Sequence, residues 1–246
     1  MATFVLVHGA WGGGWEWRWV RAGLRSAGHE VFTPTLTGLG ERAHLISPDV
    51  GLGTHIEDVA AVLRSEELHD VVLCGQSSGG MVVTGVADRE PERIGHLVYL
   101  DALVPSDGQS AVDLIPSELM DPVRERTRAE GDGYRMPFPF GDQPEPGMSD
   151  ELLRWYAGKM TDHPLQAFEE PIRLTGRGDA IPRTYIRCRQ GAEVVAPSAE
   201  VARRKGWGYV EIDGPHDVQV VNPAAVVAVL RAIGEGASPI YGDSSA

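Results

Sequence analysis

Residues 70–80 read DVVLCGQSSGG, an apolar run that ends in two serines set among glycines. An uninterrupted apolar run is typical of a parallel strand that helices cover on both faces. Gly75, Ser77 and Gly79 then match the pattern G-x-S-x-G, in which the serine occupies a tight turn from strand to helix. The glycines let strand and helix pack closely, and the serine hydroxyl projects above the sheet. We therefore predict Ser77 as a nucleophile, because Ser78 has no such pair of glycines.

Outward from this stretch, short runs rich in Val, Leu and Ile alternate with longer patterns of helical periodicity. This alternation predicts an α/β fold, in which a mostly parallel central sheet is flanked by helices. Ligands of such sheets bind at the carboxyl ends of the strands. We expect strands over 4–8, 29–35, 70–75, 96–102, 183–189 and 208–212, and helices over 15–27, 54–65, 79–90 and 223–233.

One long segment, 105–181, interrupts the alternation. It contains the proline-rich stretch MPFPFGDQPEPG and a helical pattern over 149–160 that Ser149 can cap. A long insertion between two strands of a compact domain is usually a lid or a binding element. We therefore expect an α/β core formed by 1–104 and 182–235, an inserted helical lid over 105–181 and a flexible C-terminal tail over 236–246.

The balance of charges limits the classes of partner. The chain has 22 basic and 35 acidic residues, which gives a formal net charge of −13. This acidity argues against non-specific binding to nucleic acids or to anionic membranes, which both require Lys and Arg patches. No apolar run approaches the ~18 residues that span a bilayer, and the first residues, MATFVLVHGA, carry no basic leader. We expect a cytoplasmic protein, monomeric or homodimeric, that acts on a small molecule.

The sequence offers no metal or cofactor motif. The two cysteines, Cys74 and Cys188, lie inside apolar runs and are expected to be reduced core thiols. Neither a CxxC pair nor a His/Cys cluster has the spacing of zinc ligands. The glycines between positions 9 and 14 lack the GK[ST] of a phosphate loop and the G-x-G-x-x-G spacing of a dinucleotide site. We therefore predict that the protein needs no metal and no cofactor.

A second glycine-rich stretch, VHGAWGGG at 7–14, directly follows the first predicted strand. A loop of this kind can aim backbone N–H groups at an oxygen on which negative charge develops. In G-x-S-x-G enzymes the other donor is the amide of the residue after the nucleophile, which is Ser78 here. We predict an oxyanion hole formed by the amide of Ala10 or Trp11 together with the amide of Ser78.

The sequence DGPHD, just beyond the last predicted strand, places His216 at the carboxyl end of the sheet, within reach of Ser77. Imidazole titrates near neutrality and is the usual base for a serine hydroxyl. We therefore predict His216 as the general base, and we expect Asp217 to cap the last helix or the preceding turn. Arg42 and His44, which follow the second predicted strand, are candidates for substrate contact.

Together these segments resemble the esterase and hydroxynitrile-lyase branch of the α/β-hydrolase superfamily. The resemblance rests on FVLVHGAWGGGWEW, GHEVFTPTLTGLGERAHL, THIEDV, VVLCGQSSGGMVVTGVADREPERIGHLVYLDALVP and TYIRCRQ, and it is weakest over 105–181. It implies an α/β-hydrolase fold, a Ser–His–acid triad, no metal and a lid of helices over the pocket. It also implies ester, thioester, lactone or cyanohydrin-like substrates.

The chain departs from that branch at the position of the triad acid. Members usually end the TYIRCRQ strand with an aspartate, whereas this chain has Gly191 there. The acid holds the histidine tautomer and stabilises the imidazolium, and its loss can cost about 10⁴-fold in turnover. Asp101, at the end of the neighbouring predicted strand, is the substitute that we favour, because other branches of the fold take their acid from that strand. Glu193, in the loop of Gly191, is the other candidate. A Ser–His dyad without an acid is the third alternative.

These observations favour a serine hydrolase that cleaves a small, largely apolar ester, thioester or lactone through an acyl-enzyme on Ser77. The alternative is a lyase, an elimination catalyst or a cyclase on the same fold, in which His216 acts as a base without an acyl-enzyme. Gly191 favours this alternative, because a weaker nucleophile would then be tolerated. A ligand-binding protein that has lost catalysis is the third hypothesis.

Overall fold

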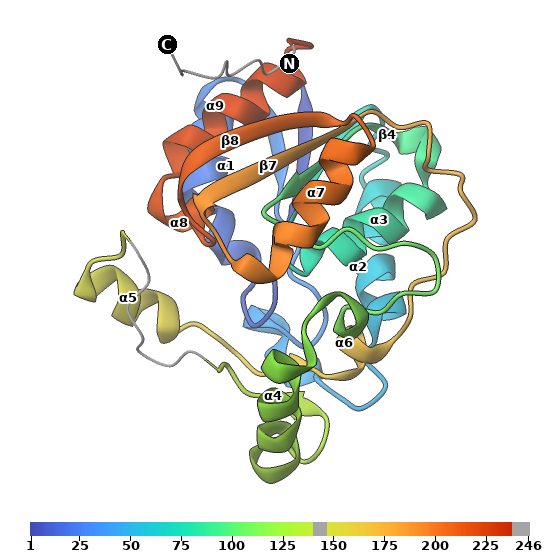
Figure 1. Ribbon diagram of the computed structural model, residues 1–246. Helices are drawn as coiled ribbons and strands as arrows, with labels where there is room; N and C mark the ends of the chain where they lie inside the picture. Colours follow the sequence, from blue (N-terminus) through green and yellow to red (C-terminus); the bar gives the residue numbers. More distant parts are fainter. Residues whose placement is uncertain (140–146, 238–246) are drawn as a thin grey trace.

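The computed structural model describes residues 1–139 and 147–237, and a six-stranded sheet forms its centre (Figure 1). The strand order is β2-β1-β3-β4-β7-β8, and every neighbouring pair in this sheet runs parallel. This parallel sheet with its flanking helices confirms the predicted fold class. The strands are β1 (Thr3–Val7), β2 (Glu30–Phe32), β3 (Val71–Gln76), β4 (Ile94–Leu100), β7 (Arg183–Gln190) and β8 (Gly208–Pro215).

Helices cover both faces of the sheet, because successive strand residues point to opposite sides. In β1, Phe4 and Leu6 belong to one hydrophobic cluster, whereas Val5 and Val7 belong to the other. The first cluster includes residues of α1 (Arg18–Ser26) and α9 (Pro223–Gly234), and the second includes residues of α2 (Leu52–Ser65), α3 (Gly79–Arg89) and α7 (Ala196–Arg204). The uninterrupted apolar strands of the sequence are thus buried on both faces.

Two helical elements that flank the sheet differ from expectation. The helix expected over 15–27 begins as a separate 3-10 turn, η1 (Gly14–Trp17), and continues as α1. The amide of Gly14 donates to Thr35 Oγ1 at 2.9 Å, which ties this turn to the loop after β2. Helix α7 was not expected from the sequence. Pro197 lies in its first turn, where the missing N–H removes no helical hydrogen bond.

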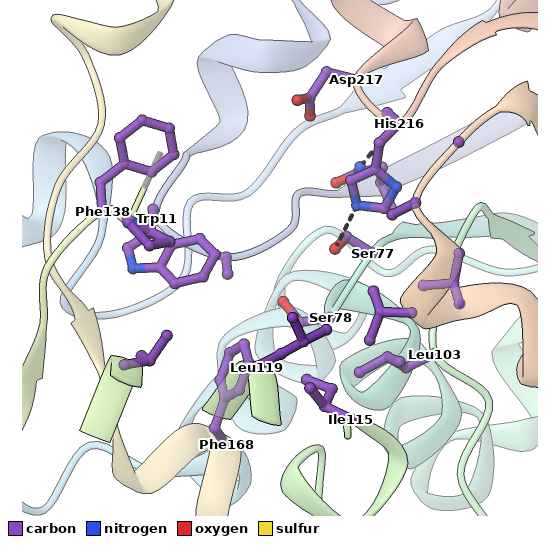
Figure 2. Close-up of a pocket in the computed structure, with 18 of the residues that line it drawn as sticks. Trp11, Ser77, Ser78, Leu103, Ile115, Leu119, Phe138, Phe168, His216 and Asp217 are labelled. Atoms are coloured by element: carbon purple, nitrogen blue, oxygen red, sulfur yellow. Dashed lines mark hydrogen bonds between the residues drawn. The ribbon is translucent and has the colours of Figure 1, made fainter. Parts of the chain in front are cut away.

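Segment 105–181 lies between β4 and β7 and forms a separate set of small elements. Helices α4 and α5 project beyond one end of the sheet (Figure 1), and side chains such as Leu119 and Phe138 line a cavity there (Figure 2). Ser149 caps α5 as expected, since its Oγ accepts a hydrogen bond from the amide of Leu152 at 3.2 Å. The elements are η4 (Val112–Leu114), α4 (Ser117–Glu130), β5 (Arg135–Met136), α5 (Asp150–Ala157), β6 (His163–Pro164) and α6 (Gln166–Glu169), with β5 and β6 antiparallel.

Three further expectations concern the thiols, the membrane and the tail. Cys74 and Cys188 are buried and free, as expected, and burial raises the pKa of both thiols. Among the described helices, none is both long and apolar enough to cross a membrane. Most of the expected C-terminal tail, 238–246, lies outside the described residues, as does 140–146 within the proline-rich stretch.

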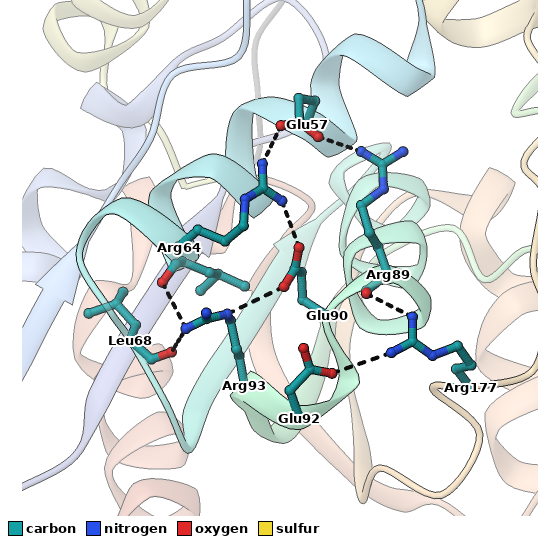
Figure 3. Close-up of polar contacts among 9 residues, drawn as sticks. Glu57, Arg64, Leu68, Arg89, Glu90, Glu92, Arg93 and Arg177 are labelled. Carbon is teal, nitrogen blue, oxygen red and sulfur yellow. Dashed lines mark hydrogen bonds and ion pairs between the residues drawn. The ribbon is translucent and has the colours of Figure 1, made fainter.

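An ion-pair network ties α2 to α3 and to the turn η3 (Pro91–Arg93) (Figure 3). Arg64 pairs with both Glu57 and Glu90, and its Nη1 lies 2.6 Å from Glu90 Oε1. Arg89 and Arg93 extend the network through the same two carboxylates, at 2.7 and 3.3 Å respectively. Glu57 is exposed, whereas Glu90 is buried. Exposed pairs contribute about 0–1 kcal/mol each, so the pairs of Glu57 fix the relative position of the helices more than they add stability.

Candidate active site

Ser77 occupies the turn between β3 and α3 with a φ of 54°, a left-handed conformation that is uncommon for a residue with a side chain. A Cβ on Gly75 would lie 2.5 Å from the carbonyl oxygen of Gly79, so the chain can reverse this tightly only with glycine there. The amide of Ser77 donates to the carbonyl of Leu100 at 3.3 Å, and its carbonyl accepts from Leu103 at 3.0 Å. The turn predicted from the sequence is therefore present and is held against the end of β4.

His216 lies between β8 and the short helix α8 (Val218–Val221), and its ring faces Ser77 (Figure 2). Its Nε2 is 2.9 Å from Ser77 Oγ, and its Nδ1 is 2.7 Å from Asp101 Oδ2. The side-chain amide of Gln76 donates to the His216 carbonyl at 3.2 Å, which holds the backbone of this loop beside the turn. The structure therefore brings the serine, the histidine and one of the two candidate acids into a single hydrogen-bonded chain.

Asp101 directly follows β4, has a φ of 43° and is fully buried. Its Oδ1 accepts from Arg187 Nη1 at 2.6 Å and from the amide of Cys188 at 3.2 Å. Its Oδ2 accepts from the amide of Ala192 at 3.2 Å and also faces His216 Nδ1 at 2.7 Å. A buried carboxylate requires such compensation, and here four donors and one guanidinium charge provide it.

Glu193, the other candidate acid, is not brought to the histidine. It is exposed and begins the 3-10 turn η5 (Glu193–Val195). The Nδ1 atom of His216, which an acid would have to reach, already faces Asp101.

The three candidate oxyanion donors are not equivalent. The amide of Trp11 donates to His163 Nδ1 at 3.3 Å, and this residue has a φ of 62°. Within the described part of the chain, the amides of Ala10 and Ser78 have no hydrogen-bond acceptor. Both residues line the cavity beside Ser77. The geometry thus leaves the amides of Ala10 and Ser78 available to a bound oxygen.

A cavity of about 630 Å³ opens above Ser77 and His216, within the usual range for small-molecule sites. Apolar and aromatic side chains form most of its wall (Figure 2), and segment 105–181 supplies many of them. Representative members are Trp11, Leu103, Ile115, Leu119, Phe138 and Phe168. Among the described residues that line the cavity there are three carboxyl groups but no lysine or arginine.

Two of those carboxyls, on Glu16 and Asp217, were not recognised from the sequence as site residues. Asp217 was expected to cap the last helix or the preceding turn, but its side chain gives no cap hydrogen bond to α8, the helix that it directly precedes. It instead hydrogen-bonds with the side chains of Tyr156 and Gln219 at the cavity. Burial raises the pKa of both carboxyls, and that of Glu16 rises well above its ordinary value. The unusual position of Glu16 among three tryptophans was the one signal available in the sequence.

Two other expected contributors lie elsewhere. Neither Arg42 nor His44 lines the cavity, so the expectation of substrate contact was wrong. Arg42 donates to the carbonyl of Thr35 at 2.8 Å and pairs with Asp58 at 3.1 Å, which gives it a structural role. Across residues 1–139 and 147–237, no group of three or more His, Cys, Asp or Glu side chains is arranged to hold a metal ion.

A family model described as "Alpha/beta hydrolase family" matches residues 4–229. The chain is 40% identical to a carbendazim hydrolyzing esterase from Nocardioides sp., over 95% of this chain and 100% of that protein. It is also 32% identical to an alpha-hydroxynitrile lyase from Arabidopsis thaliana, over 52% of this chain and 48% of the lyase.

Among solved structures, an extracellular alpha/beta-hydrolase from a Paenibacillus species superposes with a TM-score of 0.85. That structure covers 95% of this chain and 99% of its own, at 24% sequence identity, and its likeness shows the fold. The family model and the Nocardioides relative both extend over nearly the whole chain. This chain therefore belongs to the alpha/beta hydrolase family and is an esterase-like member of it.

Proposed function

We propose that the protein is a serine esterase in which Ser77 is the nucleophile, His216 the general base and Asp101 the acid. The observation that carries this proposal is the hydrogen-bonded chain from Ser77 through His216 to Asp101, at 2.9 and 2.7 Å, which opens into an apolar cavity. The relationship to an esterase over the full length of that relative supports the same reaction class.

The roles of the three residues follow from the atoms that face one another. The His216 Nδ1–H donates to Asp101, so the lone pair of Nε2 points at the hydroxyl of Ser77. As Ser77 Oγ attacks a carbonyl carbon, Nε2 takes its proton and later gives it to the leaving alcohol. Asp101 holds this tautomer and stabilises the imidazolium.

The negative charge that develops on the carbonyl oxygen would be met by the amides of Ala10 and Ser78. Both are backbone donors fixed before the reaction, so they need no reorganisation as the charge forms. Of the two donors expected in the first loop, Trp11 is the weaker candidate, because its amide already donates to His163. Water then attacks the acyl carbon in the place that the alcohol has left. His216 takes a proton from this water and returns it to Ser77 Oγ as the acid is released.

The cavity favours a small, largely apolar ester, thioester or lactone. Aromatic and aliphatic side chains surround Ser77 on the substrate side, and they would bind an acyl or alcohol group by burial of apolar surface. Side chains of α4, α5 and α6 contribute to that wall, which supports the lid predicted over 105–181.

Hydrolysis of p-nitrophenyl butanoate by four forms of the protein tests the proposal. Ser77→Ala should lose nearly all turnover, about 10⁶-fold by analogy with other serine enzymes. Asp101→Asn should lose about 10⁴-fold, because the wrong tautomer is then favoured. Glu193→Gln is the matched control and should retain wild-type turnover. A folded wild type without turnover, or an equal loss in both acid variants, would contradict the assignment.

The non-hydrolytic alternative loses its main argument at this site. It was favoured by the missing carboxylate at Gly191, but the carboxylate of Asp101 lies 2.7 Å from His216 Nδ1. Labelling with a fluorophosphonate distinguishes the two mechanisms. A serine esterase should be modified at Ser77 and lose activity in step with labelling, whereas an enzyme that uses His216 alone as a base should remain unlabelled.

A further inference from the structure

We propose that Glu16 and Asp217 form a subsite for a cationic nitrogen, so that the enzyme prefers esters whose alcohol or acyl part carries a protonated amine. This inference rests on the proposed esterase function of the same cavity. It concerns which substrates bind rather than how the ester is cleaved.

The two carboxyls belong to different elements that meet at the cavity. Glu16 lies in η1 and is only 2% exposed, whereas Asp217 directly follows His216. Both line the cavity that contains Ser77, and Figure 2 shows the Asp217 carboxyl on the same side of the cavity as the His216 ring. A group bound between the carboxyls would therefore share this cavity with the reacting atoms.

Within the described part of the chain, no lysine or arginine forms an ion pair with Glu16 or Asp217. The described lining of the cavity also contains Glu118 and no basic residue other than His216. Apart from His216, whose charge acts on Asp217, the described lining therefore offers Glu16 and Asp217 no cation.

Gln219 provides an independent sign that this cluster lacks a donor. Its side chain is fully buried on α8, its Nε2 lies 3.5 Å from Glu16 Oε2, and it also hydrogen-bonds with Asp217. Its Oε1, an acceptor, has no hydrogen-bond partner among the described residues. Buried polar groups of native proteins are normally satisfied, so this acceptor is open to a donor from a bound ligand.

A protonated amine has the complementary properties. It supplies the positive charge that two buried carboxyls lack, and its N–H group is a donor. Burial and then the neighbouring Asp217 raise the pKa of Glu16 well above its ordinary value, so this carboxyl holds a proton more firmly than an exposed one. A bound cation would replace that proton. A substrate with a carboxylate at this place would meet only like charge.

Two matched pairs of esters test the subsite. Dimethylaminoethyl butanoate carries the cation in its alcohol part, and isopentyl butanoate is its neutral isostere. Ethyl γ-dimethylaminobutyrate carries the cation in its acyl part, and ethyl isoheptanoate is its neutral isostere. Acid release at constant pH gives kcat/KM for all four compounds with the wild type and with Glu16→Gln, Asp217→Asn and Glu118→Gln.

We expect the wild type to prefer the cationic member of at least one pair by about 10-fold or more, the usual effect of a hydrogen bond to a charged group. Glu16→Gln and Asp217→Asn should each remove most of that preference. Glu118 lines the same cavity but is exposed, so Glu118→Gln should leave the preference at its wild-type value. If Asp217 acted only through His216, Asp217→Asn would slow both members equally, and that outcome would overturn the subsite.

The test separates the subsite from the esterase activity. Turnover of the neutral esters without any preference for the cationic ones overturns the subsite and leaves the esterase proposal intact. If no ester is cleaved, the esterase proposal fails. A calorimetric titration with dimethylbutylammonium then measures the affinity of the cavity for a cation and still tests the subsite. The wild type should then bind this cation about 10-fold more tightly than Glu16→Gln, and equal affinities would overturn the inference.

Discussion

Gly191 and Asp101 compete for the same space. A Cβ on Gly191 would lie 2.8 Å from the Asp101 Cγ and closer still to its Oδ2. Real Cβ atoms do not approach other atoms so closely, and Asp101 cannot retreat, because it is fully buried among four hydrogen-bond donors. The glycine at 191 is therefore part of the arrangement that lets the carboxylate of Asp101 reach His216.

This relationship predicts the effect of a single methyl group. Gly191→Ala should displace Asp101 from His216 Nδ1 and lower kcat/KM by about 100-fold, the usual cost of a misplaced catalytic group. Glu193→Ser is the control. It changes an exposed residue of the same loop and should have little effect on kcat/KM. Wild-type kcat/KM in Gly191→Ala would show that the two residues do not compete.

The same relationship predicts that the acid can be moved. Asp101→Gly should lose activity but create space, and glycine suits the φ of 43° at that position. Adding Gly191→Asp would then offer His216 a carboxylate from the end of β7. We expect the double variant to be at least about 10-fold more active than Asp101→Gly alone, as part of the effect of the acid is restored. Equal kcat/KM values for the two variants would contradict this prediction.

Arg187 should support both the stability of the fold and the position of Asp101. Its Nη1 lies 2.6 Å from Asp101 Oδ1, and its side chain is only 15% exposed. Arg187→Met would leave a buried carboxylate without its cation, which typically costs about 3–5 kcal/mol. We expect a lower free energy of unfolding by denaturant and a lower kcat. Arg189→Met is the control, because this side chain is 53% exposed and should cost less than about 1 kcal/mol.

Trp11 connects segment 105–181 to the loop that carries Ala10. Its indole Nε1 donates to the carbonyl of Met136 at 2.9 Å, and its carbonyl accepts from the amide of Thr161 at 2.9 Å. Trp11→Ala would remove the first bond and part of the cavity wall. We expect kcat/KM to fall by about 100-fold, and less in Trp11→Phe, which keeps a ring.

The control for this prediction is Trp207→Ala. Trp207 stacks on Tyr99 at a centroid distance of 5.4 Å and does not line the cavity. The substitution Trp207→Ala removes an indole of equal size, so it should lower the melting temperature more than it lowers kcat/KM. An equal loss of kcat/KM in the two alanine variants would indicate a general destabilisation and would contradict a specific role of Trp11.

Much of the fold and two site residues could be predicted from the sequence, because they depend on local patterns. The apolar run before Ser77 and the glycines around it determine a buried strand followed by a tight turn, whatever the rest of the chain does. The role of His216 could be predicted because it comes directly after the last predicted strand, at the carboxyl end of the sheet. The helices α4 and α7 were missed, and both carry a proline within the helix or its first turn, which weakens a helical pattern.

The sequence favoured Asp101 as the acid but could not exclude Glu193, for a different reason. Asp101 and Glu193 both lie between Ser77 and His216 in the chain, and local pattern does not distinguish them. The choice depends on how β4 and β7 pair, which places Asp101 beside the Gly191 loop. Glu16 was missed because a single charge at a helix start is usually exposed. Its partner Gln219 is 203 positions away in the chain.

Glu16 should make the stability of the protein depend on pH in a direction opposite to that of a typical carboxylate. Its folded-state pKa lies well above the ordinary value of 4.5, mainly because of burial and then because of Asp217. Between these two values the folded state binds more protons than the unfolded state, so the free energy of unfolding falls as pH rises. Glutamine cannot ionise, and its amide could donate to the unpartnered Oε1 of Gln219.

Glu16→Gln should therefore raise the melting temperature at about pH 8 and have little effect at about pH 4, where Glu16 is protonated in both states. Each kcal/mol gained corresponds to about 2–4 °C for a chain of this size. Scanning calorimetry between these pH values measures the difference, with the exposed Glu118→Gln as the control that should show no such trend. A difference in melting temperature that stays constant across this pH range would mean that Glu16 does not carry its proton into the folded state, and the raised pKa would have to be abandoned.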